Sequence, residues 1–189
     1  GSMFIYDNIV IPPSNPSGPN RGAIILSGGE GSRVVGNIVA APLFGNPEWS
    51  SAVILLIGSK YSLVEGNSII GSSAEYGIII VGSPVWQNLD PSWVYANNNI
   101  IRNNIIENVE HGIGFAGQAL DNSALNNTIT SIDVGFIEEF GYDGMPSGNI
   151  IRDNNISGAS LRGIELNSNL INGAAYVTPI SITKNTFAN

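Results

Sequence analysis

A short phrase recurs along the whole chain: an apolar pair, any residue, a small or polar residue, asparagine, any residue and an apolar residue. Its aligned asparagines are Asn8, Asn37, Asn67, Asn104, Asn127, Asn154 and Asn185, at separations of 29, 30, 37, 23, 27 and 31 residues. A second, apolar phrase alternates with it, at Gly22 to Leu26, Ser51 to Leu55, Gly77 to Val81, Gly112 to Phe115, Gly135 to Glu139 and Gly163 to Leu166. Two alternating phrases indicate stacked repeats that share one core.

The residues that fill the repeat favour strands and turns over helices. Only 12% of the 189 residues are charged, whereas glycine, asparagine, isoleucine, serine and valine are abundant. Long surface helices need glutamate, lysine, alanine and leucine on their wet face, and this chain is poor in such stretches. Isoleucine and valine favour strands, and asparagine and glycine favour tight turns. The composition therefore predicts an all-β protein.

Stacking explains both the periodicity and its irregular length. Short strands with one apolar face become buried when successive coils stack about 4.8 Å apart and pair their backbones. An asparagine that recurs at one corner is expected to form a ladder, each side-chain amide bonding the coils beside it. The unequal separations predict loops that leave the stack at fixed corners while the strands keep their register.

The pattern resembles the right-handed parallel β-helix repeats of the pectate-lyase-like superfamily, from about Asp7 to Phe187. The resemblance implies an all-β fold: a single-stranded right-handed parallel β-helix, or solenoid, of about six to seven coils with an Asn ladder. It further implies that the asparagine turn separates the second and third strands of a coil, that the second phrase is the first strand, and that loops beside this first strand border a substrate groove. It implies an extracellular or cell-surface location.

The domain organisation follows from the same pattern. Residues 1–3 are typical of an expression-tag remnant, and residues 4–189 are expected to form one β-helix domain. Coil-like sequence runs from Phe4 to Phe187 without a segment that would cap either end. We therefore expect a fragment of a larger protein or a domain whose ends a partner chain covers.

The outward positions of the first strands are expected to carry an apolar patch. If the residue after the opening glycine points inward, the outward sets are Ile24, Val53, Ile79, Gly114, Ile137 and Glu165, then Leu26, Leu55, Val81, Ala116, Glu139 and Asn167. The opposite parity exposes Ile25, Ile54 and Ile80, which are apolar too. Because such patches are normally covered, we expect a loop of the chain, another domain or a second copy on this groove-side face.

Three carboxylates interrupt the apolar first strands, at Glu138, Glu139 and Glu165. Adjacent strand residues face opposite ways, so one of Glu138 and Glu139 is expected in the interior unless a bulge turns both outward. Glu139 and Glu165 are expected one coil and about two residues apart, or roughly 8 Å, which matches the range of about 6.5–9.5 Å between the carboxyl groups of inverting glycosidases. These glutamates are the catalytic candidates; the alternative is that they only solvate the surface.

Other residues near the expected groove suit a sugar ligand. Exposed aromatic rings stack on sugar faces, although they equally serve as loop anchors. The candidate substrate-binding residues are Trp86, Trp93 and Tyr95 in one long insert, with Asn167, Arg162 and the only histidine, His111. Arg102 and Arg152 share one repeat position and are expected to be surface charges away from the groove.

Charge and composition exclude several other classes of function. A net charge of −8 disfavours nucleic acid as a partner, because phosphate contacts need clustered lysine and arginine. No apolar run approaches the roughly 18 residues of a membrane helix, so no membrane insertion is expected. The chain has no cysteine and no cluster of histidine, aspartate and glutamate at metal-binding spacing, so neither a metal nor a cofactor is expected.

Two functional hypotheses remain from the sequence. The first is a β-helix that engages a carbohydrate polymer, as a glycoside hydrolase or glycan-transferring enzyme that uses the paired glutamates. The second is a non-catalytic structural or adhesive domain of a surface or spike protein, or a carbohydrate-binding module. The first strands lack the lysine and arginine of the superfamily's lyases, and the chain lacks the Asp trio and Gly-His-Gly signature of its polygalacturonase-like hydrolases. The resemblance therefore does not assign an activity.

Overall fold

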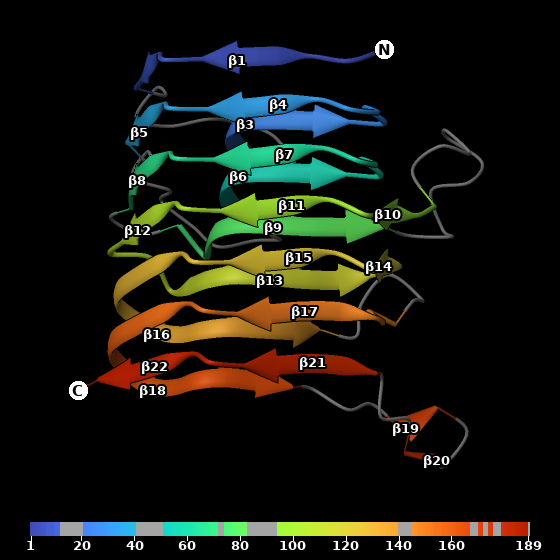
Figure 1. Ribbon diagram of the computed structural model, residues 1–189, viewed down its shortest axis with the longest axis vertical. Coiled ribbons are helices and arrows are strands. Elements are labelled where there is room, and N and C mark those ends of the chain that lie inside the picture. Colours follow the sequence, from blue (N-terminus) through green and yellow to red (C-terminus); the bar gives the residue numbers. More distant parts are fainter. Residues whose placement is uncertain are drawn as a thin grey trace.

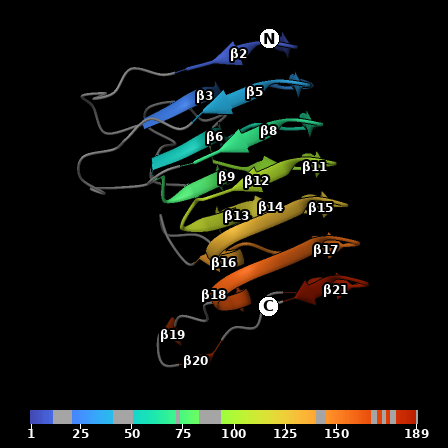
Figure 2. The same ribbon diagram turned by 90° about the vertical axis from the view of Figure 1, so that its left-hand side faces the viewer.

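The computed structural model describes residues 1–11, 21–40, 51–71, 74–82, 94–139, 145–166, 170–171, 174–175 and 179–188. Every regular element in these residues is a β-strand, and the strands of successive coils pair in parallel. Figures 1 and 2 show the coils stacked along the long axis, with the N-terminus in the coil at one end and the C-terminus in the coil at the other. The all-β fold and the parallel β-helix predicted from the sequence are confirmed.

The strands form two principal sheets. The first, the short-strand sheet, has seven parallel strands: β1 (Phe4–Tyr6), β4 (Arg33–Val35), β7 (Leu63–Glu65), β11 (Ile100–Arg102), β15 (Ser123–Leu125), β17 (Asn149–Arg152) and β21 (Ile180–Thr183). The second sheet has eleven strands. It contains β2 (Ile9–Val10), β5 (Ile38–Ala40), β8 (Ser68–Ile70), β12 (Ile105–Glu107), β22 (Thr186–Ala188), β3 (Arg21–Ser27), β6 (Ser51–Ile57), β9 (Tyr76–Gly82), β13 (His111–Gly117), β16 (Thr128–Glu139) and β18 (Asn155–Leu166).

The second sheet has two parts that β16 and β18 join. The first residues of β16 pair with β12, and the first residues of β18 pair with β22. The later residues of β16 pair with β13, and the later residues of β18 pair with those of β16. The part formed by β3, β6, β9, β13 and the later halves of β16 and β18 is called the long-strand sheet below. Two smaller pairs complete the strands: β10 (Ala96–Asn97) with β14 (Ala119–Leu120) in parallel, and β19 (Leu170–Ile171) with β20 (Ala174–Ala175) antiparallel.

One apolar residue from each strand of the short-strand sheet points into the interior. Two rows of residues from the long strands fill it from the other side. In the short-strand sheet the buried row is Val34, Val64, Ile101, Ala124 and Ile151. Each such residue lies directly above its counterpart in the next coil, so each coil that lies between two others is covered on both sides. Burial of a valine or isoleucine side chain contributes about 1.5–3 kcal/mol, which makes these rows the main source of stability.

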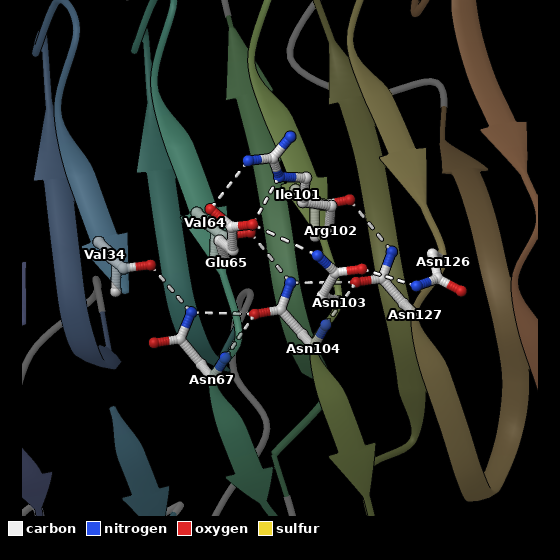
Figure 3. A network of polar contacts seen from close by, with 10 residues as sticks. All are labelled: Val34, Val64, Glu65, Asn67, Ile101, Arg102, Asn103, Asn104, Asn126 and Asn127. Carbon is white, nitrogen blue, oxygen red and sulfur yellow. Dashed lines mark hydrogen bonds and ion pairs between the residues drawn. The ribbon is translucent and has the colours of Figure 1, made fainter. Parts of the chain in front are cut away.

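The predicted asparagine ladder runs the length of the stack. Each Asn Nδ2 donates to the Oδ1 of the ladder asparagine in the next coil, at 2.9–3.1 Å, from Asn8 to Asn185. Figure 3 shows its central part, where Asn67, Asn104 and Asn127 form a continuous chain of amides. The residue before each ladder asparagine has a positive φ: Asp7, Gly36, Gly66, Asn103, Asn126, Asp153 and Lys184. Glycine, asparagine and aspartate tolerate this conformation best, which explains the small or polar residue in the repeated phrase.

A second ladder, which was not predicted from the sequence, lies at the other end of the strands of the short-strand sheet. It consists of Ser32, Ser62, Asn99, Asn122 and Asn149, joined from coil to coil by bonds from each backbone N–H to the next side-chain oxygen. Each of these residues again follows one with positive φ: Gly31, Tyr61, Asn98, Asp121 and Gly148. Every member lies five residues before a member of the first ladder, because one three-residue strand separates the two corners. This constant spacing is visible in the sequence.

The glycines of the second repeated phrase leave room for the interior. A Cβ at Gly77, Gly112 or Gly135 would lie 2.5–2.8 Å from the side chain of an interior isoleucine, which is Ile106, Ile129 or Ile156 respectively. A real Cβ does not approach so closely, so a larger residue would push the coils apart. The strand therefore has two adjacent inward positions at this point, and simple alternation fails there.

The structure confirms one part of the predicted outward set and contradicts another. Ile79, Gly114, Ile137 and Glu165 do share one row on the outer face of the long-strand sheet. The assignments of Ile24, Val53 and Leu26 were wrong, since all three belong to the interior cluster. The reason is the register: Gly22 and Ala52 lie in one row with Tyr76, so the phrase that begins at Gly22 is offset by one residue from the phrase that begins at Gly77, and the phrase that begins at Ser51 is offset by two.

The predicted apolar patch exists on the outer face and is buried. It is a cluster separate from the interior core, formed by Ala52, Leu55, Ile57, Tyr76, Ile79, Val81, Ala116, Val134 and Ile137, with Ile25 packed against it. The nine buried members are at most 4% exposed in the single chain. The patch is thus covered without a second copy of the chain.

In the described residues, no helix is long and apolar enough to cross a membrane.

A polar network lies on the outside of the first ladder corner (Figure 3). Arg102 on β11 donates to both carboxylate oxygens of Glu65 on β7, at 2.8 and 3.0 Å, and Asn103 also donates to Glu65. Asn126 Nδ2 in turn donates to Asn103 Oδ1 at 2.7 Å. The hydrogen bonds and positive charge of Arg102 lower the pKa of Glu65 from its ordinary value. Arg102 and Arg152 both lie at the surface, as predicted.

Loss of a ladder side chain should destabilise the fold. In Asn154→Ala, the backbone N–H of Asn127 and the carbonyl of Ala124 lose their partners in the stack. Each buried polar group left without a partner costs about 1–3 kcal/mol. Urea unfolding followed by circular dichroism should show a lower midpoint for this variant. Asn155→Ala is the matched control, because that neighbouring side chain is exposed and should change the midpoint little.

Removal of Arg102 should raise the Glu65 pKa toward its ordinary value, because Arg102 is the largest cause of its depression. A depressed pKa in the folded state means that the ion pair stabilises the fold above the pKa of the unfolded chain, and that this contribution disappears as the pH falls through the folded-state pKa. In Arg102→Met, the midpoint of the Glu65 titration, followed by the NMR chemical shift of its side-chain carboxyl carbon, should therefore lie at a higher pH than in the wild type. Arg152→Met, whose partner is Asp153, should leave the Glu65 titration unchanged.

Candidate functional site on the outer face of the last coils

The outer face of the long-strand sheet changes from apolar to polar toward the C-terminal end. Along one outer row the residues are Ile25, Leu55, Ile79, Gly114, Ile137 and finally Glu165. Along another they are Gly22, Ala52, Tyr76, His111, Val134 and finally Arg162. Charged and hydrogen-bonding groups therefore gather over β16 and β18, where the buried apolar cluster ends.

Glu139 and Glu165 lie on this polar part of the face. Glu139 is beside Ala116 of the preceding coil, and Glu165 is beside Ile137, two residues before Glu139 in its own strand. One coil spacing of about 4.8 Å and two residues of about 3.3 Å each separate their Cα atoms by roughly 8 Å. Both side chains are only partly buried, so a ligand on the outer face can reach both carboxylates.

Arg162 holds the Glu165 carboxylate. Its Nη1 donates to Glu165 Oε2 at 2.7 Å, within the same strand. The arginine side chain is largely exposed, so the pair contributes little to the stability of the fold. Its effect is local: the guanidinium fixes where the carboxylate points and leaves other N–H groups available to a polar ligand.

His111 is anchored on the same face but away from the two glutamates. Its ring packs on Tyr76 of the preceding coil, with centroids 5.1 Å apart, and its Nε2 is 3.9 Å from Glu110 Oε1. Within the part of the chain that the structure describes, the buried Nδ1 has no hydrogen-bond partner. Val134 lies between His111 and Arg162, so two coil spacings, about 10 Å, separate these residues along the stack. The histidine is at the edge of the polar region.

A further polar pair at the start of the outer face was not found from the sequence. Ser160 on β18 donates a short hydrogen bond to the Asp133 carboxylate on β16. The register between the two strands shifts just there, between Ile132 and Val134. Both backbone N–H groups of Asp133 and Val134 donate to the Glu110 carbonyl, at 3.0 Å each. No repeated phrase marks this irregularity, so the sequence carried no signal for it.

Glu138, a predicted catalytic residue, points into the solenoid. It shares an interior row with Phe115 and Leu166 and is 4% exposed. The general expectation that one of the two adjacent glutamates faces inward is correct, and Glu138 is that residue. An outer-face ligand cannot reach its carboxylate, and Glu138 is therefore not part of the candidate site.

The second ladder explains why a carboxylate is tolerated in the interior. Asn149 is the last asparagine of that ladder, because its partner position in the next coil is Ile180, which offers no amide. Asn149 Nδ2 instead donates to Glu138 Oε1 at 2.9 Å. Glu138 thus replaces the missing amide oxygen at the end of the ladder.

The remaining predicted site residues divide into two groups. Trp86, Trp93 and Asn167 lie outside the described residues. Tyr95 is exposed, just before β10. The backbone on either side of Tyr95 approaches the end of β9, since a Cβ at Gly82 would be 2.7 Å from the Val94 carbonyl and 2.8 Å from the Ala96 nitrogen. Tyr95 therefore flanks the long-strand sheet, several coils from Glu165.

The described residues offer no metal centre. They contain no group of three or more histidine, aspartate or glutamate side chains arranged to hold an ion. What the outer face does offer is two accessible carboxylates, a guanidinium and a histidine ring on rigid strands. Such an arrangement can hydrogen-bond to hydroxyl groups and can transfer protons.

Substitutions at Glu138 should separate its ladder role from any role of charge. Glu138→Gln keeps an oxygen acceptor for Asn149 and should unfold at nearly the wild-type urea concentration. Glu138→Leu leaves the Asn149 amide without that acceptor and should cost about 1–3 kcal/mol of unfolding free energy. Equal midpoints for Glu138→Leu and the wild type would show that the ladder does not need this acceptor.

Comparison with known proteins supports the fold. No protein-family model matches the sequence, and no curated protein matches it significantly. A similar solved structure is a mutant tailspike protein of the E. coli bacteriophage HK620 in complex with a hexasaccharide, with a TM-score of 0.64 and 14% sequence identity. The similarity covers 89% of this chain and 30% of the tailspike chain, so this chain spans less than a third of that protein. At this identity the likeness establishes a shared parallel β-helix architecture.

Proposed function

We propose that the outer face of β16 and β18 binds a carbohydrate polymer and that Glu139 and Glu165 hydrolyse a glycosidic bond there. The observation that carries this proposal is the offset of the two carboxylates by one coil and two residues on one accessible face. The resulting separation of about 8 Å leaves room for a water molecule opposite the leaving group, as inverting hydrolysis requires.

The two glutamates would have different roles. Glu165 pairs with Arg162 as a carboxylate, which is the form that a general base needs. In the proposed reaction Glu165 takes a proton from the water that attacks the anomeric carbon. Glu139 gives its proton to the glycosidic oxygen as the bond to the leaving sugar breaks. The configuration at the anomeric carbon inverts, and one sugar end is released for each water consumed.

The likeness to a tailspike in complex with a hexasaccharide supports a sugar ligand, although the two chains share only 14% of their residues. Sugar binding also fits the polar groups of the outer face, since Arg162 and His111 can donate to hydroxyl groups. We assign Trp86, Trp93 and Tyr95 as stacking platforms and Asn167 as a further hydrogen-bonding group, on their chemistry alone. A polymeric glycan ligand would accord with an extracellular or cell-surface location.

The second candidate is binding without turnover, either by a carbohydrate-binding module or by an adhesive or structural domain. Two observations favour it: Glu138 serves the interior ladder, and the carboxylate of Glu165 is already engaged by Arg162. Both candidates predict a ligand on the same face, and only the release of product separates them.

Product analysis on glycans selected from an array should decide the matter. Glu139→Gln and Glu165→Gln should each lower the rate of product release by at least about 100-fold, because each removes one proton-transfer group. Binding to the same glycan should persist in both variants, since glutamine keeps the shape and an acceptor oxygen. Glu107→Gln is the control, because Glu107 lies on β12, away from the long-strand sheet.

The outcomes distinguish the candidates directly. Binding with no product from the wild-type protein would exclude hydrolysis and leave the carbohydrate-binding module. The absence of both binding and product across polysaccharides of varied linkage would contradict a carbohydrate function altogether. An inverted anomer, measured by NMR immediately after cleavage, is expected, and a retained anomer would contradict the assigned roles of the two glutamates.

A further inference from the structure

Lysine and arginine lie mostly away from the long-strand sheet. Five of the seven in the chain are on strands of the short-strand sheet or beside its ladder corners: Arg33, Lys60, Arg102, Arg152 and Lys184. The strands β6, β9, β13, β16 and β18 together contain one arginine, Arg162, and no lysine. The remaining arginine, Arg21, opens β3, which is five coil spacings, about 24 Å, from β18.

Carboxyl groups, by contrast, follow the proposed site over its whole length. Asp133 lies where the outer part of β16 begins, and Glu139 is six residues further along the same strand, or about 20 Å. Glu165 on β18 lies level with Ile137, and Glu110 lies one coil before Asp133. The side chains of all four acidic residues are at least partly exposed. A polymer on this face therefore meets carboxyl groups along its length.

These carboxyl groups have little positive charge near them. The guanidinium of Arg162 donates to Glu165, so its charge is already matched. Among the described residues, no lysine or arginine forms an ion pair with Glu110, Asp133 or Glu139. The basic group that approaches them, a histidine ring, is 3.9 Å from Glu110. The outer face is therefore negative where the ligand is proposed to bind.

Such a face complements hydroxyl groups and opposes acidic ones. An ionised carboxylate accepts hydrogen bonds and has no proton to donate, whereas a sugar hydroxyl can donate. The acidic group of a uronic acid, a sulfate or a phosphate is an acceptor too, and its charge is repelled over a screening length of about 8 Å at physiological salt. Asp133, Glu165 and Glu139 are spaced about 13 Å and 7 Å apart along the strands, so each part of a ligand there lies within that length of a carboxyl group.

Given the function proposed above, on which this inference rests, we propose that the glycan bound on this face is uncharged. It carries hydroxyl groups and no uronic acid, sulfate or phosphate. Free amino groups are excluded for a different reason. An ammonium group beside Glu139 would stabilise the ionised form of that carboxyl group, whereas Glu139 needs a proton to give to the glycosidic oxygen. Hydroxyl groups donate to the carboxylates and leave the charge of the site unchanged.

A matched pair of glycans tests the role of charge. The glycan that binds in the array is oxidised so that part of its primary hydroxyl groups become carboxylates, while its linkages stay the same. Binding is measured in the Glu139→Gln background, where the glycan is not cleaved. In about 0.01 M salt, where charges act over about 30 Å, the oxidised form should bind at least about tenfold more weakly than its parent.

The salt dependence separates repulsion from the simple loss of hydroxyl groups. In about 1 M salt, where charges act over about 3 Å, most of the difference between the two glycans should disappear. The affinity for the uncharged parent should change less than about twofold between the two salt concentrations, because no charged group of the ligand is involved.

A double substitution tests whether these carboxylates cause the discrimination. Glu110→Gln with Asp133→Asn removes two charges from the face, and the new asparagine keeps an oxygen that can accept from Ser160. The low-salt penalty for the oxidised glycan should fall by at least about threefold, while the parent glycan binds as before. Glu30→Gln with Asp153→Asn is the matched control, because it removes two charges at the ladder corners and should leave the penalty unchanged.

The results separate this inference from the function on which it rests. Tight binding of an acidic or amino-bearing glycan, or an equal affinity for the parent and oxidised forms at low salt, would overturn the inference and leave glycan hydrolysis standing. A penalty that the Glu110→Gln and Asp133→Asn substitutions do not reduce would overturn its electrostatic cause. Binding of no glycan at all would contradict the proposed function itself, and the inference with it.

Discussion

The structure depends on the repeated hydrogen bond between an asparagine amide and the coil above or below it. At each ladder corner the chain turns sharply, and several backbone N–H and C=O groups lose the regular pairing that strands provide. A side-chain amide has both donors and acceptors, so it satisfies the groups of two coils at once. Because the amide reaches its neighbour only at the strand spacing, the ladders also fix the register in which the apolar rows stack.

This constraint explains the exceptions as well as the rule. Where the second ladder meets Ile180, the donor of Asn149 would be left buried and unpaired, which costs more than most single contacts contribute. The chain places the carboxylate of Glu138 at that point. Glu138, which the sequence predicts as a catalytic candidate, is thus a hydrogen-bond acceptor with a structural role. Its neighbour Glu139 faces the surface.

The sequence predicts the parts of the fold that repeat. The first ladder could be assigned residue by residue, because the same phrase surrounds its asparagine in every coil. The face of each long-strand residue could not be assigned, because two adjacent positions point inward at Gly77 and its counterparts, and because the phrases at Gly22 and Ser51 are offset from the Gly77 phrase by one and two residues. Ile24, Val53 and Leu26 were misassigned for that reason, whereas the relation between Glu139 and Glu165 depends only on the last coils, where the phrases align. The second ladder was overlooked because its first two members are serines.

A solenoid separates the residues that specify its fold from those that can vary. Corner asparagines, turn glycines and interior isoleucines are constrained in every coil, whereas an outward row touches only its neighbours in that row. One such row changes from isoleucine to glutamate over successive coils without altering the interior beneath it. Function on this scaffold can therefore arise where the outer apolar cluster ends, and the outward Glu165 can be substituted with little consequence for stability, unlike the inward Glu138. That difference allows the chemistry of the outer face to be tested on an intact fold.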